Sequence, residues 1–451
     1  MAEDYMDRMD LNAQQLYFSD YGKGKANGVA PLDNNGKVSP TYLEIKYLSE
    51  LKVSLNDPSQ SNVCDWLTRL KSSDYKNAGI SSWKNSNLYN SASISNVREF
   101  VASNNSLTFF VRTSSKIYQA VYDNQTADLD QPFTLTELTD ITGTCNKIEI
   151  VTISGKEYVT FATNSGGWIA EIELDGSLSN LTQVYTSSAC SALHYIGENK
   201  WLALGYSVLG NSNRGLYVTD NIFSGIFQLI SNGEWRYVEG TINSEGTSAC
   251  VLTADAPGST AGASAGVYYT LDGESINSAI SLSTPTVLAF NGESFICRIW
   301  NDTTQTIWTS TDGITWTPDN TLAAIQTFTG IWWCSSSVAS FAHYILGNPG
   351  YSNFKTYTEQ GVELTDINGN SLAITDVISV ESPDGVTRIL LKTYNKLYVM
   401  NSSGKFEELT MPSAPTGSGK IGFQRSAGIV HCLSNTAHYS GKYVYAPQGR
   451  L

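Results

Sequence analysis

Residues that could carry out catalytic or metal chemistry are few or scattered in this sequence. It has four His and seven Cys without a CxxC pair, so there is little material for a zinc site. His431 and Cys432 are adjacent on a predicted strand, where neighbouring side chains point to opposite faces, so a shared metal is not expected. The cysteines are expected to be small core residues. We therefore predict no metal site and no cofactor.

Paired carboxylates are the remaining source of catalytic chemistry. A glycosidase needs two of them at a set separation, and 42 Asp and Glu residues provide many accidental pairs that the sequence cannot rank. No GxSxG, Walker or GxGxxG motif stands between a strand and a helix, which disfavours serine hydrolases and nucleotide-binding enzymes. The sequence thus singles out no catalytic residue and favours binding over catalysis.

Aromatic side chains offer a different chemistry, the binding of a glycan or another polar ligand. Tyr, Trp, Asn, Ser and Gly dominate the loops, a composition that combines rigid rings with adaptable hydrogen bonding. The candidate ligand-binding residues are Trp235, Trp332, Trp333 and Tyr351. The alternative is a place in the core, because Trp332 and Trp333 on one strand must point to opposite faces.

A repeat of short strands must position these residues. From residue 107 onward, an apolar run followed after a turn by an aromatic-centred strand recurs eight times, as in Trp201-Leu-Ala-Leu204 and Gly215-Leu-Tyr-Val218. The interval of about 45 residues is that of a four-stranded propeller blade. We predict an all-β fold in which residues 86–451 form a β-propeller of eight four-stranded blades. The number is seven if residues 247–283 are an inserted hairpin or a distorted blade.

The last copy reaches the C-terminus before it supplies a fourth strand. Residues 87–90 precede the first full copy and are predicted to provide the missing outer strand. Closure by both ends of the chain would remove an exposed sheet edge.

One turn of the repeat has a specific pattern, carried by Ser310, Asp312, Gly313 and Trp316. It resembles the Asp-box hairpin of sialidases and other propellers, in a variant one residue shorter. The chemistry of such a turn is structural: the Asp caps turn amides, the Gly takes a positive φ, and the Trp packs between strands. Weaker versions occur at 173–176, 270–273 and 401–406.

The resemblance to sialidases would imply three arginines around a substrate carboxylate. Arg112 and Arg298 lie on predicted inner strands, and Arg214 precedes an outer strand. The Arg-Ile-Pro start of the first sialidase arginine is missing, which disfavours this activity.

The first 85 residues differ from the repeat. The segment 24–43 closely resembles the "ANGVAPLDxNGKVPxxYLP" segment of bacteriophage tail fibres and other tail appendages. Ser39 before Pro40, and Glu44 in place of the closing Pro, depart from it. The residues that match are Lys25, Ala26, Asn27, Gly28, Val29, Ala30, Pro31, Leu32, Asp33, Asn35, Gly36, Lys37, Val38, Tyr42 and Leu43.

The same segment also predicts a hairpin with Asn35 and Gly36 at its tip. A hairpin of this size cannot bury enough surface alone, so it needs a partner chain or a neighbouring domain. Helices are predicted over 42–51 and 59–70. Residues 1–85 are therefore predicted to be a small mixed α/β attachment or oligomerisation module, the alternative being a linker that packs on its own propeller.

The functional expectation combines the two parts. A net charge of −14 argues against binding to nucleic acid or anionic membrane, and no secretory signal or membrane-spanning apolar run is visible. The resemblance implies a structural virion protein of a bacteriophage, made in the host cytoplasm: a homo-oligomeric tail appendage or receptor-binding protein. Its partners would be other virion proteins and a host surface glycan or protein. The alternatives are a polysaccharide-cleaving propeller enzyme, of glycosidase or lyase type, and a purely architectural component.

Overall fold

The computed structural model describes most of the chain beyond residue 74. The described residues are 75–85, 97–122, 133–187, 189–206, 214–254, 265–281, 284–301, 304–319, 329–348, 355–381, 387–401, 403–409, 411, 416–417, 419–424, 429–434 and 438–447. The attachment motif at 25–37, the two predicted helices and Tyr351 lie outside them. The chain divides into two units, Met1–Ser82 with Ser382–Val386 and Lys442–Leu451, and Trp83–Glu381 with Thr387–Gly441. The predicted boundary between residues 85 and 86 stays a prediction.

Regular structure in the described residues consists of β-strands and one 3-10 turn, η3 (Ile222–Ser224). Seven sheets have four strands each. The first four are β2 (Glu99–Ala102), β3 (Thr108–Arg112), β4 (Ile117–Tyr122), β5 (Phe133–Glu137); β6 (Cys145–Ile153), β7 (Lys156–Thr163), β8 (Gly166–Ile172), β9 (Leu178–Tyr185); β10 (Ala189–Gly197), β11 (Lys200–Tyr206), β12 (Gly215–Thr219), β13 (Gln228–Asn232); and β14 (Trp235–Glu239), β15 (Cys250–Ala254), β16 (Gly266–Thr270), β17 (Asn277–Ser281).

The other sheets follow the same order, with one exception. Those with four strands are β18 (Thr284–Phe290), β19 (Phe295–Asn301), β20 (Thr304–Ser310), β21 (Thr317–Asp319); β25 (Ile374–Glu381), β26 (Thr387–Thr393), β27 (Leu397–Met400), β28 (Phe406–Glu408); and β29 (Lys420–Gln424), β30 (Ile429–Leu433), β31 (His438–Pro447), β1 (Tyr75–Asn85). The exception has three strands, β22 (Gly330–Ser336), β23 (Phe341–Gly347) and β24 (Tyr357–Thr358).

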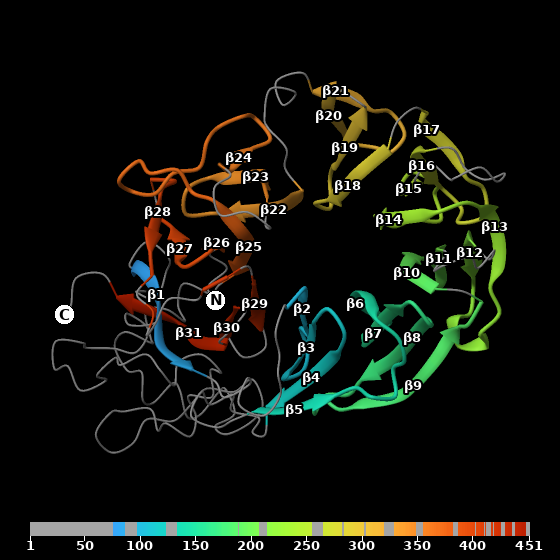
Figure 1. The fold of residues 1–451 in the computed structure, drawn as a ribbon, viewed down its shortest axis with the longest axis horizontal. Helices are drawn as coiled ribbons and strands as arrows, with labels where there is room; N and C mark the ends of the chain where they lie inside the picture. The colour runs from blue at the N-terminus through green and yellow to red at the C-terminus, as the bar shows by residue number, and fades with distance from the viewer. Residues whose placement is uncertain are drawn as a thin grey trace, which may run out of the picture. The chain divides into compact units, whose positions relative to one another are not determined.

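The first strands of the sheets close a ring within the second unit. Each of β2, β6, β10, β14, β18, β22, β25 and β29 contacts the next, and β29 contacts β2. Figure 1 shows these strands around a central opening. Pairing within the sheets is antiparallel, as in β6–β9. The predicted all-β propeller with four-stranded antiparallel blades is thus confirmed.

The prediction of eight four-stranded blades is wrong, because seven sheets have four strands and the sheet β22–β24 has three. After the two-residue strand β24, isolated bridges join Tyr357 to Glu363 and Thr365 to Ser371 instead of a fourth strand. Asp366 holds this segment by accepting from the backbone N–H groups of Asn368 and Asn370. The segment suspected of irregularity, 247–283, belongs to the regular sheet β14–β17.

The outer strand of the closing sheet also differs from the prediction. It is β1, at residues 75–85, whereas the predicted residues 87–90 lie outside the described part of the chain. In the order β1-β31-β30-β29, the sheet still combines an N-terminal strand with C-terminal strands.

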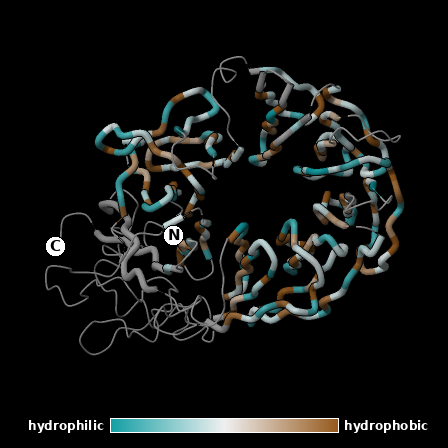
Figure 2. The backbone as a smooth tube through the Cα atoms, viewed as in Figure 1, coloured by the Kyte–Doolittle hydropathy of each residue, from teal (hydrophilic) through white to brown (hydrophobic). Residues whose placement is uncertain are grey.

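The core lies between neighbouring sheets, and the second strands are buried on both faces. In β15, Cys250, Leu252 and Ala254 pack toward β10–β13, while Val251 packs with Phe295 of the sheet β18–β21. In the sequence, strands that are buried on both faces appear as continuous apolar runs. Hydrophobic stretches consequently recur from sheet to sheet along the backbone in Figure 2. All six cysteines within the described residues are free and buried, as predicted for core thiols.

The turn at Ser310–Trp316 joins the third and fourth strands of its sheet. Asp312 Oδ1 accepts from the N–H groups of Ile314 (2.8 Å) and Thr315 (2.7 Å) and from Ser310 Oγ (2.9 Å). The Trp316 indole donates to the Gly313 carbonyl over 3.0 Å. Gly313 has φ +73°, and a β-carbon there would lie 2.7 Å from Cγ2 of Val251 in the preceding sheet. Glycine is therefore required both by the turn and by the close approach of two sheets.

The same turn recurs in two other sheets. At 270–275, Asp272 accepts from two backbone N–H groups over 2.8 Å each, and at 173–177 Asp175 accepts from Ser177 N over 2.9 Å. The glycines that follow, Gly273 and Gly176, also have positive φ and also face side chains of the preceding sheet. The repeated turn is thus a contact between blades.

Replacing Gly313 by alanine should separate these two requirements. Gly404 provides a matched control, because its φ is +75° and nothing lies within 4 Å of its added β-carbon. Gly404→Ala is expected to cost about 1–2 kcal/mol of unfolding free energy from the left-handed conformation alone. Gly313→Ala should cost about 1–3 kcal/mol more, because the methyl group overpacks the contact with Val251. Chemical denaturation measures both, and equal losses would contradict the inter-sheet role.

Candidate functional site

The structure places the predicted ligand-binding aromatic residues mainly in the core. Trp235 is fully buried, with its ring 5.2 Å from that of Tyr268, so the prediction that it binds a ligand at the surface is wrong. Trp332 and Trp333 are partly buried and pack against different hydrophobic clusters, Trp333 with its ring 5.0 Å from Tyr344. They join β22 to its two neighbouring sheets, and a binding role for them stays a prediction.

The three arginines considered for a sialidase-like site do not converge. Arg112 pairs with Glu99 over 2.8 Å and donates to the Cys145 carbonyl over 3.0 Å. Arg298 lies on β19 and is 3% exposed, and Arg214 pairs with Glu234 over 2.8 Å. These residues belong to three sheets, and at least one whole sheet lies between any two of them in the ring. The geometry therefore disfavours joint binding of one carboxylate.

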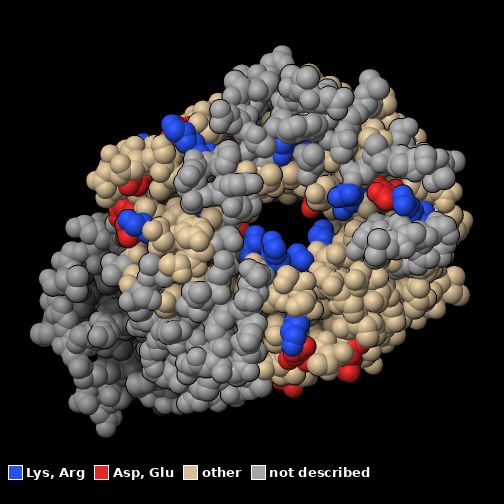
Figure 3. Space-filling model, viewed as in Figure 1, with Lys and Arg blue, Asp and Glu red and all other residues tan. Residues whose placement is uncertain are grey.

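A charged cluster on the inner strands instead joins three sheets. Glu149 on β6 accepts from Lys147 Nζ (2.5 Å) and lies 3.0 and 3.1 Å from Nδ1 of His194 on β10. His194 Nε2 lies 3.0 Å from the carbonyl oxygen of Gly240, which follows β14. Beside the cluster is a cavity of about 310 Å³ lined by Glu149, Ile150, Val151, Thr160, His194, Tyr195, Trp201 and Thr241. Figure 3 shows Lys and Arg side chains at the edge of the central opening.

Burial and charge act in opposite directions on this cluster. Burial favours the neutral form of Glu149, but the charges of Lys147 and His194 outweigh it and lower the pKa of Glu149 to about 2. Burial likewise disfavours the charged form of His194, but the Glu149 carboxylate outweighs it and raises the pKa of His194 above its usual value. For Glu239, burial dominates and raises its pKa, although Lys147 and His194 oppose this.

Two nearby carboxylates with oppositely shifted pKa values are the arrangement that acid–base catalysis uses. Here, however, both oxygens of Glu149 lie within hydrogen-bond distance of His194, and Lys147 takes one of them as well. The Thr160 hydroxyl, which lines the cavity, donates to the Leu193 carbonyl over 3.1 Å. Glu149, His194 and Thr160 therefore all have partners within the protein, which favours a structural role.

Sequence reasoning missed this cluster. Glu149 and His194 are 45 residues apart, and His194 and Gly240 are 46 apart. The available signal was the blade repeat, which places residues one period apart at neighbouring positions of adjacent inner strands. In the described residues, no group of three or more His, Cys, Asp and Glu side chains is placed to hold a metal ion, and no helix is long and apolar enough to cross a membrane.

The His194–Glu149 pair predicts a pH-dependent stability. Because folding raises the pKa of His194, its contribution is complete below the unfolded value of about 6.5 and is lost as pH rises through the folded pKa. We expect His194→Gln to reduce the unfolding free energy by about 1–3 kcal/mol at about pH 5.5, and by less at about pH 9.

Denaturation of both proteins at the two pH values measures this difference. NMR titration of His194 supplies a direct check, since the chain has four histidines. Glu149→Gln should lower the pKa of His194, and an unchanged pKa would contradict the assigned cause.

Comparisons with known proteins found no matching family model and no matching curated protein. The solved Dos1 propeller is 10% identical, with a TM-score of 0.45 over 81% of this chain and 96% of that chain. The Pan2 WD40 domain of Neurospora crassa is 8% identical, with a TM-score of 0.42 over 83% and 99%. A gluconolactonase from Xanthomonas campestris is 9% identical, with a TM-score of 0.35 over 78% and 99%. The propeller fold of this chain therefore rests on its own sheet order and inter-sheet contacts.

Proposed function

We propose that this protein is a structural virion protein of a bacteriophage, a tail appendage or receptor-binding protein that contacts the host cell surface. The observation that carries the proposal is the match of residues 25–38 to a segment of phage tail appendages. In this proposal the N-terminal module attaches the chain to other virion proteins, and the propeller faces the host. The protein acts as a homo-oligomer on the particle.

Binding agrees better than cleavage with the inner-strand chemistry. A catalytic carboxylate must reach its substrate, whereas Glu149 is held by Lys147 and His194 on the inner strands. Propellers host many activities, so the fold by itself does not choose between them.

A polysaccharide-cleaving enzyme is the second candidate, and the opposite pKa shifts of Glu149 and Glu239 are the observation that favours it. An enzyme would release reducing ends from the envelope polysaccharide of the host, and Glu239→Gln would abolish that release. Saturable binding to cells without shortening of the glycan supports the binding role.

The location on the particle is tested by immunogold labelling of purified virions with an antibody against residues 86–451. Label on the tail or its fibres is the expected result. Particles that carry no label would overturn the proposal.

The role of the N-terminal module is tested by deleting residues 1–74, which keeps strand β1. We expect the shortened protein to melt cooperatively and to be absent from particles assembled in its presence, because the attachment segment is gone. Incorporation at the level of the full chain would contradict the attachment role while leaving the binding role of the propeller open to its own assay.

A further inference from the structure

One loop of the sheet β10–β13 departs from the turn that other sheets share. Asn221 occupies the place of Asp312, since its Oδ1 accepts from the N–H group two residues on, that of Phe223, over 3.2 Å. The next residue is Ile222, where three other sheets have the glycine that faces the preceding sheet. The loop is also longer: residues 220–227 separate β12 from β13, against 311–316 between β20 and β21.

The extra length forms the turn η3, which is capped at its C-terminal end by Gly225 with φ +66°. Ile222 is buried and packs among residues of the two sheets β6–β9 and β10–β13. Phe223, in contrast, has 54% of its surface exposed, and Ile226 in the same loop has 74%. An apolar loop tip is thus held at the surface by a buried neighbour.

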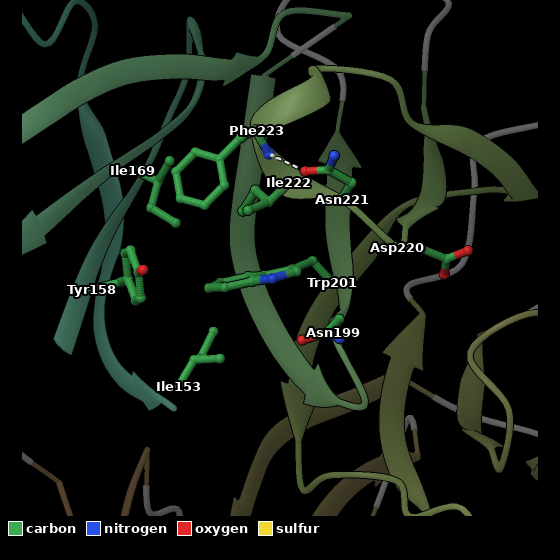
Figure 4. Close-up of a pocket in the computed structure, with 9 residues that line it drawn as sticks. All are labelled: Ile153, Tyr158, Ile169, Asn199, Trp201, Asp220, Asn221, Ile222 and Phe223. Atoms are coloured by element: carbon green, nitrogen blue, oxygen red, sulfur yellow. Dashed lines mark hydrogen bonds between the residues drawn. The ribbon is translucent and has the colours of Figure 1, made fainter. Parts of the chain in front are cut away.

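A pocket of about 180 Å³ lies between these two sheets at the loop (Figure 4). The sheet β6–β9 contributes Ile153, Tyr158 and Ile169. The sheet β10–β13 contributes Asn199, Trp201 and residues 220–223. In three other sheets a glycine at this place permits close approach, whereas the side chains of Ile222 and Phe223 stand beside this opening.

Three aromatic residues, Tyr158, Trp201 and Phe223, line the pocket beside isoleucines and polar residues. The rings of Tyr158 and Phe223 are 5.9 Å apart at an angle of 58°, and Trp201 is 2% exposed. In Figure 4 these three rings surround the opening. Exposed ring faces bind the C–H faces of pyranose rings by apolar contact, while the rim remains available for hydrogen bonds.

Polar groups at the pocket have capacity for a ligand. Among the described residues, the Asp220 carboxylate and the Asn199 side-chain amide make no hydrogen bond. Both residues are exposed, and Asn221 adds a third polar side chain. Asp220 also interacts electrostatically with Lys200 and helps to raise the pKa of that amine. A carboxylate and amides accept from and donate to the hydroxyl groups of an uncharged ligand.

The size of the pocket limits the ligand. Sites for drug-sized molecules have volumes of about 300–1,000 Å³, so 180 Å³ accommodates a single ring. We propose that this pocket binds one neutral hexopyranose unit of a bacterial surface glycan, with Phe223 and Tyr158 against the ring and Asp220 and Asn199 on its hydroxyl groups. The inference deepens the proposed function and rests on it for the source of the glycan.

The test uses the full chain and a defined panel of sugars. Methyl glycosides of glucose, galactose, mannose, N-acetylglucosamine and N-acetylgalactosamine are titrated by saturation-transfer NMR. We expect at least one to bind saturably. Phe223→Ala and Asp220→Asn should each weaken that binding about tenfold or more, through loss of the ring face and of the charged acceptor.

Matched controls come from the corresponding turn of the sheet β18–β21. Ile314 and Thr311 occupy the places of Phe223 and Asp220, so Ile314→Ala and Thr311→Ala should leave the affinity unchanged. Phe223→Leu keeps an apolar side chain without a ring and should weaken binding as Phe223→Ala does. An unchanged melting temperature of both variants excludes misfolding as the cause. If no glycoside binds, or if all variants bind equally well, the proposal that this pocket binds a hexopyranose is wrong.

Parallel binding of the full chain to host cells separates this failure from failure of the proposed function. If the protein binds cells saturably and Phe223→Ala does not change this binding, the proposed sugar site is wrong and the receptor-binding role stands. If sugar binding requires Phe223 and Asp220 but the protein neither binds host cells nor is present on virions, the proposed function is wrong. The proposed sugar site then stands.

Discussion

No blade of this protein can bury its apolar faces alone, and the rest of the structure depends on this. The second strand of a sheet sends alternate side chains to two different neighbours, as β11 does with Leu202 and Leu204 on one face and Trp201 and Ala203 on the other. Each buried face contributes about 25 cal/mol for every Å² removed from water only when the neighbouring sheet is in place. Closure of the ring therefore stabilises every sheet at once, including the three-stranded one.

Apolar packing is not directional, so polar contacts set how neighbouring sheets are placed on each other. Between the first two sheets, Glu157 accepts from Ser103 Oγ over 2.5 Å and from Asn104 N over 3.0 Å. Gln424 on β29 donates to the Ser103 carbonyl over 2.8 Å, where the last sheet meets the first. The Glu149–His194–Gly240 bridge does the same for three successive sheets. Charged residues on the inner strands are thus largely explained by assembly of the ring.

Because the same turn recurs in several sheets, a sheet that lacks it shows where the chain has changed locally. Gly176, Gly273 and Gly313 bring the same turn against the preceding sheet, so a sheet with Ile222 at that place has been altered locally without loss of the fold. Phe223 contacts Tyr158 of the preceding sheet yet has 54% of its surface exposed, and the exposed Asp220 carboxylate lines the same pocket. A loop of this kind on a rigid scaffold is where binding residues are commonly found. The proposed contact with a host glycan and the proposed attachment through the N-terminal module would then lie on separate parts of the chain.

The sequence by itself determined the features that depend on local signals. Apolar runs followed by aromatic strands at a constant interval predicted the propeller, and the pattern Ser310-x-Asp312-Gly313 predicted the hydrogen bonds of its turn. Only the tertiary structure decided the rest. Trp235 is buried because its face of β14 meets a neighbouring sheet, and the fourth strand after β24 is replaced by a turn held by Asp366. The ion-pair bridge and the pocket join residues about one repeat or more apart, such as Tyr158 and Phe223. The hydrophobic pattern of a strand indicates whether a residue is buried or exposed. Which neighbouring sheet that residue faces is decided only when the sheets pack into the ring.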